Sequence, residues 1–590
     1  MRAFRKDRQR WFSQCWLVAL CAASFSHAFG GAPRVLPSDK LPADRRYEEL
    51  RGVNSYHPFH KVESAAAWNE RAQRLRRQLL VGSGLWPMPE KTPLKAVIHG
   101  RVERDDYTVE RVFFEAVPGD FVTGSLYRPE NRPAAKLPGV LCPHGHWHNG
   151  RFYENSEAGA RREIVNGAER FVAAGRYPLQ ARCVQLARMG CVVFHYDMLG
   201  NADSVQLGFH RPSFREHLAG TKLGEWGFMS PAADARLQTV FGLQTLHSIR
   251  AVDFLRSLPE VDSERIAVTG ASGGGTQSMI LGAIDQRVAA SFPCVMVSTA
   301  MQGGCTCENT HYLRVGDGNI DIAALTAPRP LGLTAADDWT VELETKGFPD
   351  LLALYKMLGH EDRVSALFAT HFKHNYNHVS RTAMYNFINR HFQLGLESPV
   401  LERDFTPLSR EEMTVWTDEH PAPEVTGELF ERRLLQQMTE ASDAQISALA
   451  PRDKESLARY HEIVGGAIQA MVGRTLPTAD EIDFELVDKQ QADGCLRMTG
   501  LVRNKTAGEE LPTLFFYPKN WNGKVVLWVA PAGKSGVYQS SGELIDPVNR
   551  LIAAGTSVVA ADLFSQGEFL GGENPPGERN RMIGYPSDGG

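Results

Sequence analysis

The 590-residue sequence lacks two features that would point to nucleic acid or to a membrane. No basic tract occurs after residue 28 and the formal net charge is only −5, so we expect no nucleic-acid partner. No apolar run is long enough to span a bilayer comfortably, so we also expect no stable membrane span. With 43% hydrophobic residues the chain can form packed cores, and its length exceeds the usual size of one domain.

Cysteine is scarce, with nine residues, of which Cys15 and Cys21 precede residue 28. Four others stand in apolar settings and are expected to be buried small hydrophobes: Cys142, Cys183, Cys191 and Cys294. Cys305 and Cys307 are too close in sequence to pair easily with each other, and no histidine has a matching spacing. We therefore expect neither a zinc site nor a cysteine nucleophile there, and no cofactor.

The N-terminal segment differs in composition from the rest of the chain. Five basic residues lie between Arg2 and Arg10, a short apolar core runs from Trp16 to Phe25, and Ser26–Ala28 has the small-x-small pattern of a cleavage site. This order predicts a secretory signal peptide over residues 1–28. We expect the mature protein to be secreted or periplasmic.

The pentapeptide Gly270–Gly274 lies between a strand-like run, Arg265–Thr269, and a helix-like run, Gln277–Leu281. A G-x-S-x-G sequence at a strand-to-helix turn is typical of the nucleophile elbow of α/β-hydrolases. Small residues flank the serine because the chain reverses sharply and leaves no room for side chains. Ser272 is therefore the predicted nucleophile, exposed at the carboxyl edge of the sheet.

A nucleophilic serine needs a base and an orienting acid, which in this fold follow it in the order Ser, Asp or Glu, His. After the apolar run Pro330–Thr334, either Asp337 or Asp338 can stand at the edge of the sheet. Ala366–Thr370 reads as the last strand, and the loop that follows it offers three candidate bases: His371, His374 and His378.

An oxyanion hole normally uses one backbone N–H after the nucleophile and one from the loop after an earlier strand. Gly273 is predicted to supply the first. The apolar strand from Pro138 ends in His144-Gly145, so His146 or Trp147 is predicted to supply the second.

The alternation of His144, His146 and His148 leaves a metal site as the alternative interpretation of this segment. The carboxylate ligands expected beside such a cluster are absent nearby, and the fold needs no metal. We therefore expect no metal ligand here, and assign His144 a structural role in shaping the loop.

Strand-like and helix-like segments alternate through the first two thirds of the chain. Two β-like runs, Tyr107–Ala116 and Phe121–Arg128, predict an antiparallel opening of the sheet. Further strands are expected near Val140, Val193, Ile266, Val295, Leu331 and Leu367. The fold class is therefore α/β, with a mostly parallel sheet flanked by helices. The insert from Asn149 to Arg182 can form part of the substrate mouth or a solvated surface.

The chain resembles secreted bacterial α/β-hydrolases of the acetylxylan-esterase-like or dienelactone-hydrolase-like group over about residues 45 to 395. The matching segments are Pro143–His146, Tyr196–Gly200, Thr269–Gln277, Gly303–Asn309, Ala335–Thr340 and His374–Asn377. The resemblance implies a triad of Ser272, Asp338 and His374. Because some carbohydrate esterases place the acid after an earlier strand, Glu308 is the alternative acid, as is Asp337.

The regular alternation of strands and helices stops beyond Gly395. We expect a catalytic domain over residues 29–396, a helical linker over 397–477 and a further domain over 478–590. Two segments of this last region parallel the catalytic domain: Lys524–Lys534 resembles Gly139–Gly145, and Leu551–Asp562 resembles Leu186–Asp197. No second G-x-S-x-G follows, which predicts an incomplete α/β-hydrolase-like domain in a truncated chain. We expect the catalytic domain to fold and act without it.

The sequence thus predicts a secreted serine esterase that acts through an acyl-enzyme. The resemblance implies acetyl esters on plant or algal polysaccharides or oligosaccharides as the substrate. Alternatives are a uronic-acid methyl esterase, a serine peptidase of the same fold and a non-catalytic glycan-binding protein. Ser272 is followed by three glycines and not by the Ser-Arg of glucuronoyl esterases, and no propeller repeat of a prolyl oligopeptidase is visible.

Overall fold

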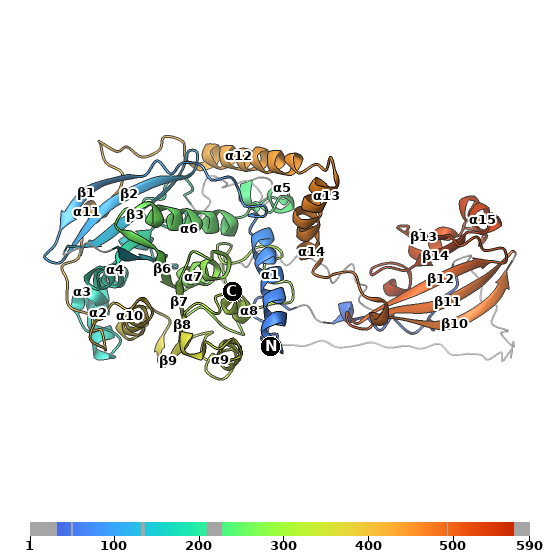
Figure 1. The fold of residues 1–590 in the computed structure, drawn as a ribbon, viewed down its shortest axis with the longest axis horizontal. Coiled ribbons are helices and arrows are strands. Elements are labelled where there is room, and N and C mark those ends of the chain that lie inside the picture. The colour runs from blue at the N-terminus through green and yellow to red at the C-terminus, as the bar shows by residue number, and fades with distance from the viewer. Residues whose placement is uncertain (1–31, 49–50, 131–135, 209–226, 493, 572–590) are drawn as a thin grey trace, which may run out of the picture. The chain divides into compact units, whose positions relative to one another are not determined.

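A computed structural model describes residues 32–48, 51–130, 136–208, 227–492 and 494–571 (Figure 1). The predicted signal peptide and the C-terminal end at Gly590 lie outside these residues. The described chain divides into two compact units, residues 51–475 and residues 32–48 with 476–571. No helix in the described ranges is long and apolar enough to cross a membrane.

The larger unit contains a nine-stranded sheet with the order β1-β2-β3-β5-β4-β6-β7-β8-β9. Its strands are β1 (Val97–Glu103), β2 (Tyr107–Val117), β3 (Asp120–Pro129), β4 (Leu137–Leu141), β5 (Val192–Tyr196), β6 (Val261–Ala271), β7 (Ala290–Cys294), β8 (Leu331–Asp337) and β9 (Val364–Lys373). The first three strands and the β3–β5 pair are antiparallel, and every later pair is parallel. This is the α/β-hydrolase sheet predicted from the sequence.

Helices cover both faces of this sheet (Figure 1). They include α1 (Ala65–Gly82), α4 (Pro178–Arg188), α6 (Val240–Ser257), α7 (Gly273–Ile284), α8 (Asn319–Ala324), α9 (Phe348–Met357) and α10 (His378–Phe392). Successive strand residues face opposite cores: Val140 packs in the cluster that holds residues of α4 and α10, and Leu141 packs in the cluster that holds residues of α6. Both faces of the central strands are buried, so these strands read as continuous apolar runs.

The segment after α10 belongs to the same unit, which differs from the linker expected over residues 397–477. It contains α11 (Arg410–Met413), α12 (Gly427–Ala448), α13 (Lys454–Tyr460) and α14 (Gly466–Val472), with a π-helical turn at His461–Gly465. The side chains of Val400, Phe405, Leu408 and Met413 are buried in the cluster that covers one face of the sheet. The loss of strand–helix alternation therefore marks the end of the sheet but not the end of the packed domain.

The smaller unit contains a five-stranded sheet with the order β10-β11-β12-β14-β13. Its elements are β10 (Ile482–Ala492), β11 (Cys495–Asn504), β12 (Glu509–Pro518), β13 (Val525–Trp528), β14 (Ser557–Ala561) and α15 (Asp546–Ala553). Only β13 and β14 pair in parallel. The order and the directions of these five strands repeat those of β1-β2-β3-β5-β4 in the larger sheet. This repeat confirms the predicted partial second α/β-hydrolase-like domain.

Among the described residues, the smaller sheet has no counterpart of the strands that follow β4 in the larger sheet. In the larger unit β4 pairs with β6 on the side away from β5. In the smaller unit the equivalent strand, β13, pairs with β14 alone among the described residues, and Val525 and Leu527 are 58% and 68% exposed. In the described part of the chain, this edge of the smaller sheet therefore presents exposed apolar side chains.

Candidate active site

The predicted nucleophile stands on a strained turn between β6 and α7. Ser272 has φ 57° and ψ −127°, a conformation that costs a non-glycine residue of the order of 1–3 kcal/mol and is typical of functional sites. A Cβ atom built on Gly270 or Gly274 would lie 2.6 Å or 2.7 Å from the carbonyl oxygen of Pro143. The two glycines are therefore required because the turn packs directly on the loop after β4.

The structure places one acid and one histidine together at the neighbouring strand ends. His374 follows β9, Asp338 follows β8, and His374 Nδ1 lies 2.7 Å from Asp338 Oδ2. The backbone N–H of Thr340 donates to the other oxygen, Asp338 Oδ1, at 2.7 Å. With both oxygens engaged, the carboxylate can orient the imidazole and favour its positive charge.

The other candidate acids have different partners. Asp337 forms an ion pair with Lys373 on the exposed surface. Glu308 is 3% exposed and accepts a hydrogen bond of 2.8 Å from the backbone N–H of Gly304, within its own loop. The carboxylate bonded to His374 is that of Asp338.

The other two candidate bases also lie elsewhere. The His371 ring packs against Phe372, with a centroid distance of 4.0 Å. His378 begins α10, and its Nδ1 lies 3.2 Å from Glu402 Oε2 in a buried network. His374 alone among the three lines the cavity that contains Ser272.

The loop after β4 packs against the serine. A Cβ on Gly145 would lie 2.8 Å from Ser272 Cβ, so only a glycine allows this approach. The His144 ring holds the loop: its Nε2 accepts a hydrogen bond of 3.1 Å from the Met198 N–H, and its Nδ1 lies 2.8 Å from the Gly145 carbonyl oxygen. His146 and Trp147 then border a cavity of about 180 Å³ with Ser272 and His374. The loop can therefore present a backbone N–H opposite the Gly273 amide.

Residues 179–299 match the model of the acetyl xylan esterase (AXE1) family. This segment covers β5, β6, the elbow and β7. The chain has the α/β-hydrolase fold and is similar to acetyl xylan esterases over this segment.

The comparison with solved structures found similar chains. Methylesterase BT1017 is 25% identical, with a TM-score of 0.51 over 65% of this chain and 78% of that one. A glucuronoyl esterase from Solibacter usitatus is 15% identical (TM-score 0.38, 60% of this chain and 99% of that one). An acetyl xylan esterase from Paenibacillus sp. R4 is 17% identical (TM-score 0.33, 57% and 98%). No curated protein matched the sequence. The similarity to acetyl xylan esterases and to the methylesterase supports a carboxylic ester hydrolase.

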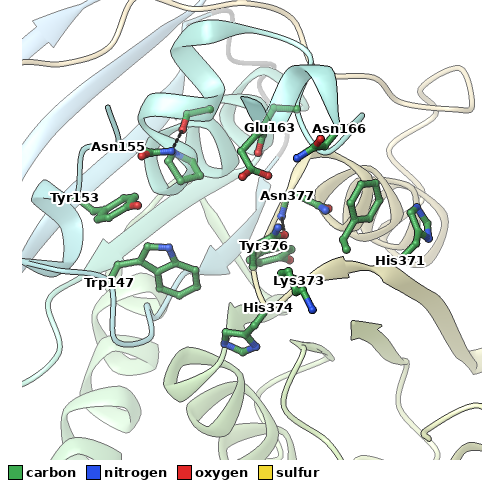
Figure 2. Close-up of a pocket in the computed structure, with 15 residues that line it drawn as sticks. Trp147, Tyr153, Asn155, Glu163, Asn166, His371, Lys373, His374, Tyr376 and Asn377 are labelled. Carbon is green, nitrogen blue, oxygen red and sulfur yellow. Dashed lines mark hydrogen bonds between the residues drawn. The ribbon is translucent and has the colours of Figure 1, made fainter. Parts of the chain in front are cut away.

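A second, larger cavity of the hydrolase lies on the His374 side (Figure 2). Its volume is about 480 Å³, and its walls combine the His374 loop with the insert after β4. The insert, which contains α2 (Glu157–Val165) and α3 (Val172–Arg176), contributes Tyr153, Asn155, Glu163 and Asn166. Trp147 and His374 border both cavities. Aromatic rings and side-chain amides are the groups that bind the apolar faces and the hydroxyls of sugars.

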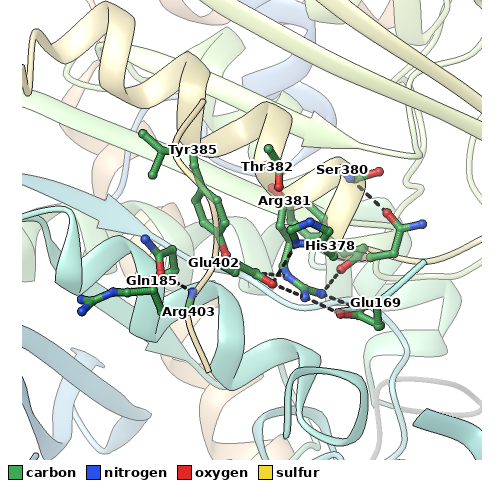
Figure 3. A network of polar contacts seen from close by, with 12 residues as sticks. Glu169, Gln185, His378, Ser380, Arg381, Thr382, Tyr385, Glu402 and Arg403 are labelled. Carbon is green, nitrogen blue, oxygen red and sulfur yellow. Dashed lines mark hydrogen bonds and ion pairs between the residues drawn. The ribbon is translucent and has the colours of Figure 1, made fainter. Parts of the chain in front are cut away.

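A buried ion network supports the loop that carries His374 (Figure 3). Arg381 in α10 is fully buried and forms ion pairs with Glu169 at 2.7 Å and with Glu402 at 2.5 Å. It also donates a 2.8 Å hydrogen bond to the carbonyl oxygen of Tyr376, whose hydroxyl lies 2.6 Å from Thr269 Oγ1 in β6. The loop is thus tied to both α10 and the central strand.

The two carboxylates of this network, Glu169 and Glu402, share the single guanidinium of Arg381. Burial alone would raise the pKa of the Glu402 carboxyl, but Arg381, His378 and Tyr385 hydrogen-bond its oxygens and hold that pKa well below its usual range. Burial raises the pKa of Glu169, which faces the same guanidinium. No local pattern predicted the roles of Glu169, Arg381 and Glu402, because Glu169 lies 212 residues before Arg381 in the sequence.

Proposed function

We propose that this hydrolase is a secreted serine esterase that removes acetyl groups from polysaccharide or oligosaccharide esters through an acyl-enzyme. The observation that carries the proposal is the His374–Asp338 hydrogen bond of 2.7 Å at the edge of the cavity that also contains the strained Ser272. A serine, a carboxylate and a histidine that follow one another in this chain order are the parts of a serine hydrolase of this fold.

The reaction follows from these positions. His374 takes the proton of Ser272 as its oxygen attacks the ester carbonyl, and Asp338 stabilises the imidazolium that forms. The backbone N–H of Gly273 and that of His146 or Trp147 stabilise the negative oxygen, where one donor is worth roughly 3–4 kcal/mol. His374 then protonates the departing alcohol, and finally activates the water that hydrolyses the acyl-enzyme.

The positions of the two cavities favour a sugar as the alcohol part of the ester. The leaving oxygen must face His374, because this residue protonates it. The 480 Å³ cavity with aromatic and amide walls lies on that side, and the cavity around Ser272 is smaller, about 180 Å³. A sugar acetate places its sugar in the larger space and its small acyl group at the serine.

The second candidate is a uronic-acid methyl esterase, which the similarity to Methylesterase BT1017 favours. In that reaction the sugar is the acyl part and methanol leaves toward His374. A hydrolysis panel of acetylated xylan, methyl-esterified pectin, nitrophenyl acetate and a peptide separates the two candidates. An acetyl esterase releases acetate from acetylated xylan, whereas a methyl esterase releases methanol from pectin.

The variant Ser272→Ala tests the mechanism. It should remain folded, and its rate of ester hydrolysis should fall by several orders of magnitude. Without the serine oxygen only direct attack by water remains, and this route lacks covalent catalysis. Ser263→Ala, near the start of the same strand, is the matched control and should keep its rate. Substantial activity in a pure, folded Ser272→Ala protein would remove Ser272 from the mechanism.

A further inference from the structure

A cluster of metal-ligating side chains lies behind the loop that borders the serine cavity. One ring nitrogen of His146, Cys305 Sγ and Cys307 Sγ all lie within 4.8 Å of one another. The distance from His146 Nε2 to Cys307 Sγ is 3.3 Å, and both cysteines are buried. We infer that these three residues form a binding site for one thiophilic metal ion, of which Zn²⁺ is the representative.

The spacing suits a tetrahedral ion. Zinc bonds of about 2.3 Å to sulfur and about 2.0 Å to nitrogen place neighbouring ligand atoms roughly 3.5–3.8 Å apart. The observed 3.3 Å is close to this value, and the limit of 4.8 Å leaves only small side-chain adjustments for the other pairs. Two sulfurs and one imidazole are also the donor set that zinc prefers.

Charge balance favours a dication at this position. Binding forms three metal–ligand bonds and releases the two thiol protons to solvent. The two thiolates then neutralise the ion, so that the buried complex carries no net charge and avoids the cost of an isolated buried ion. In the other cluster of this kind among the described residues, His60 with Asp317 and Asp321, the guanidinium of Arg71 already pairs with both carboxylates.

The loop that holds the two thiols is closed by its own hydrogen bonds. The Glu308 N–H donates to the Cys305 carbonyl oxygen at 3.0 Å, and its carboxylate accepts from the Gly304 N–H at 2.8 Å. The Asn309 side chain donates to the Gly303 carbonyl oxygen at 2.8 Å. Both thiols are therefore presented on a turn that needs little ordering before it binds an ion.

A small cavity beside the cluster offers room for the fourth ligand. It has a volume of about 10 Å³ and is lined by His146, Cys307, Gly273, Asn201 and Gln244, among others. This is about the space of one water molecule, and two side-chain amides provide it with polar partners. The bound ion would link the His146 loop to the 303–309 turn next to the elbow, so that its expected role is to stabilise the loop.

Cobalt binding tests the proposal on the full chain, kept reduced and stripped of metal. One Co²⁺ per chain should bind and produce the thiolate-to-cobalt charge-transfer absorption together with the strong visible bands of a tetrahedral ion. Zn²⁺ should displace it and raise the Tm. No ester is present in this titration, so its result is independent of the proposed function.

Two variants and one control make the assignment specific. Both the double variant Cys305→Ser/Cys307→Ser and the single variant His146→Ala should lose the charge-transfer band or shift it. Cys191→Ala, which removes a buried thiol elsewhere, should keep it. Absence of the bands in the wild-type chain, or unchanged bands in the double variant or in His146→Ala, would overturn the proposal. If the double variant fails to fold, the cobalt spectrum of His146→Ala tests the assignment of the ligands.

Discussion

Replacement of Glu402 by glutamine should destabilise the larger unit strongly, although this residue lies outside the predicted catalytic domain. Its carboxylate accepts hydrogen bonds from Arg381 at 2.5 and 2.8 Å and from Tyr385 at 2.6 Å, and His378 Nδ1 lies 3.2 Å away. Removal of one partner of a buried ion pair costs about 3–5 kcal/mol because the other charge remains buried. Glu169 still faces Arg381 at 2.7 Å, so we expect a value near the lower limit, about 3 kcal/mol.

Urea unfolding of the Glu402→Gln and wild-type chains measures this difference. The matched control is Glu397→Gln, five residues earlier and exposed, for which a change within about 0.5 kcal/mol is expected. Ester hydrolysis by Glu402→Gln should fall as well, because Arg381 also holds the Tyr376 carbonyl oxygen at 2.8 Å, two residues after His374. Equal stability of the two variants would refute the assignment of the network as a support for the loop.

The same substitution predicts a dependence on pH. The pKa of Glu402 is depressed in the folded chain by Arg381 and its other hydrogen-bond donors, which outweigh the burial that would raise it. A carboxyl whose folded pKa is depressed contributes stability above its unfolded pKa, about 4.3, and loses it as the pH falls toward its folded pKa. The stability gap between wild type and Glu402→Gln should therefore be full at pH 7 and should narrow below about pH 4. A gap that stays constant down to pH 3 would contradict this reasoning.

Two further predictions concern the acid and the extent of the domain. Asp338→Asn should keep its fold and lose roughly 10⁴-fold in kcat, because the amide no longer stabilises the imidazolium, whereas Asp337→Asn should be nearly unchanged; equal losses in a hydrolysis assay would argue against Asp338 as the acid. A chain that ends at Thr475 should be soluble and active, and one that ends at Leu396 should be insoluble or unfolded, because it lacks Glu402 and the buried side chains that follow it. Gel filtration and circular dichroism measure whether each shortened chain is soluble and folded. A folded, active chain that ends at Leu396 would show that residues 397–475 are dispensable.

The local sequence pattern was sufficient to predict the nucleophile elbow and the class of fold. A strand, a sharp turn and a helix are consecutive in sequence, so the glycines around Ser272 and the apolar runs beside them carry the whole signal. The partial second domain was predicted for the same reason, since its strands repeat the apolar pattern of the first ones. The repeat of strand order between the two sheets shows that the pattern specified topology as well.

The local sequence pattern could not predict which of several neighbouring residues is the acid and which is the base. Asp337 and Asp338 differ by one residue, yet one pairs with Lys373 on the surface and the other with His374. The position of a side chain after a strand end depends on how the loop turns and on which partner it meets. The resemblance to a known family chose Asp338 and His374, but the hydrogen bond is a property of the folded chain.

Tertiary structure alone decided the contacts between segments that are far apart in sequence. Glu402 joins the catalytic unit although the strand–helix alternation has ended, and His146 meets Cys307 across 161 residues, where we expected no histidine partner for the cysteines. A sequence pattern reports the face that a residue presents within its own strand or helix. Which residues meet there is decided by the packing of the whole chain, because burial and charge pairing lower the free energy only once distant segments have come together.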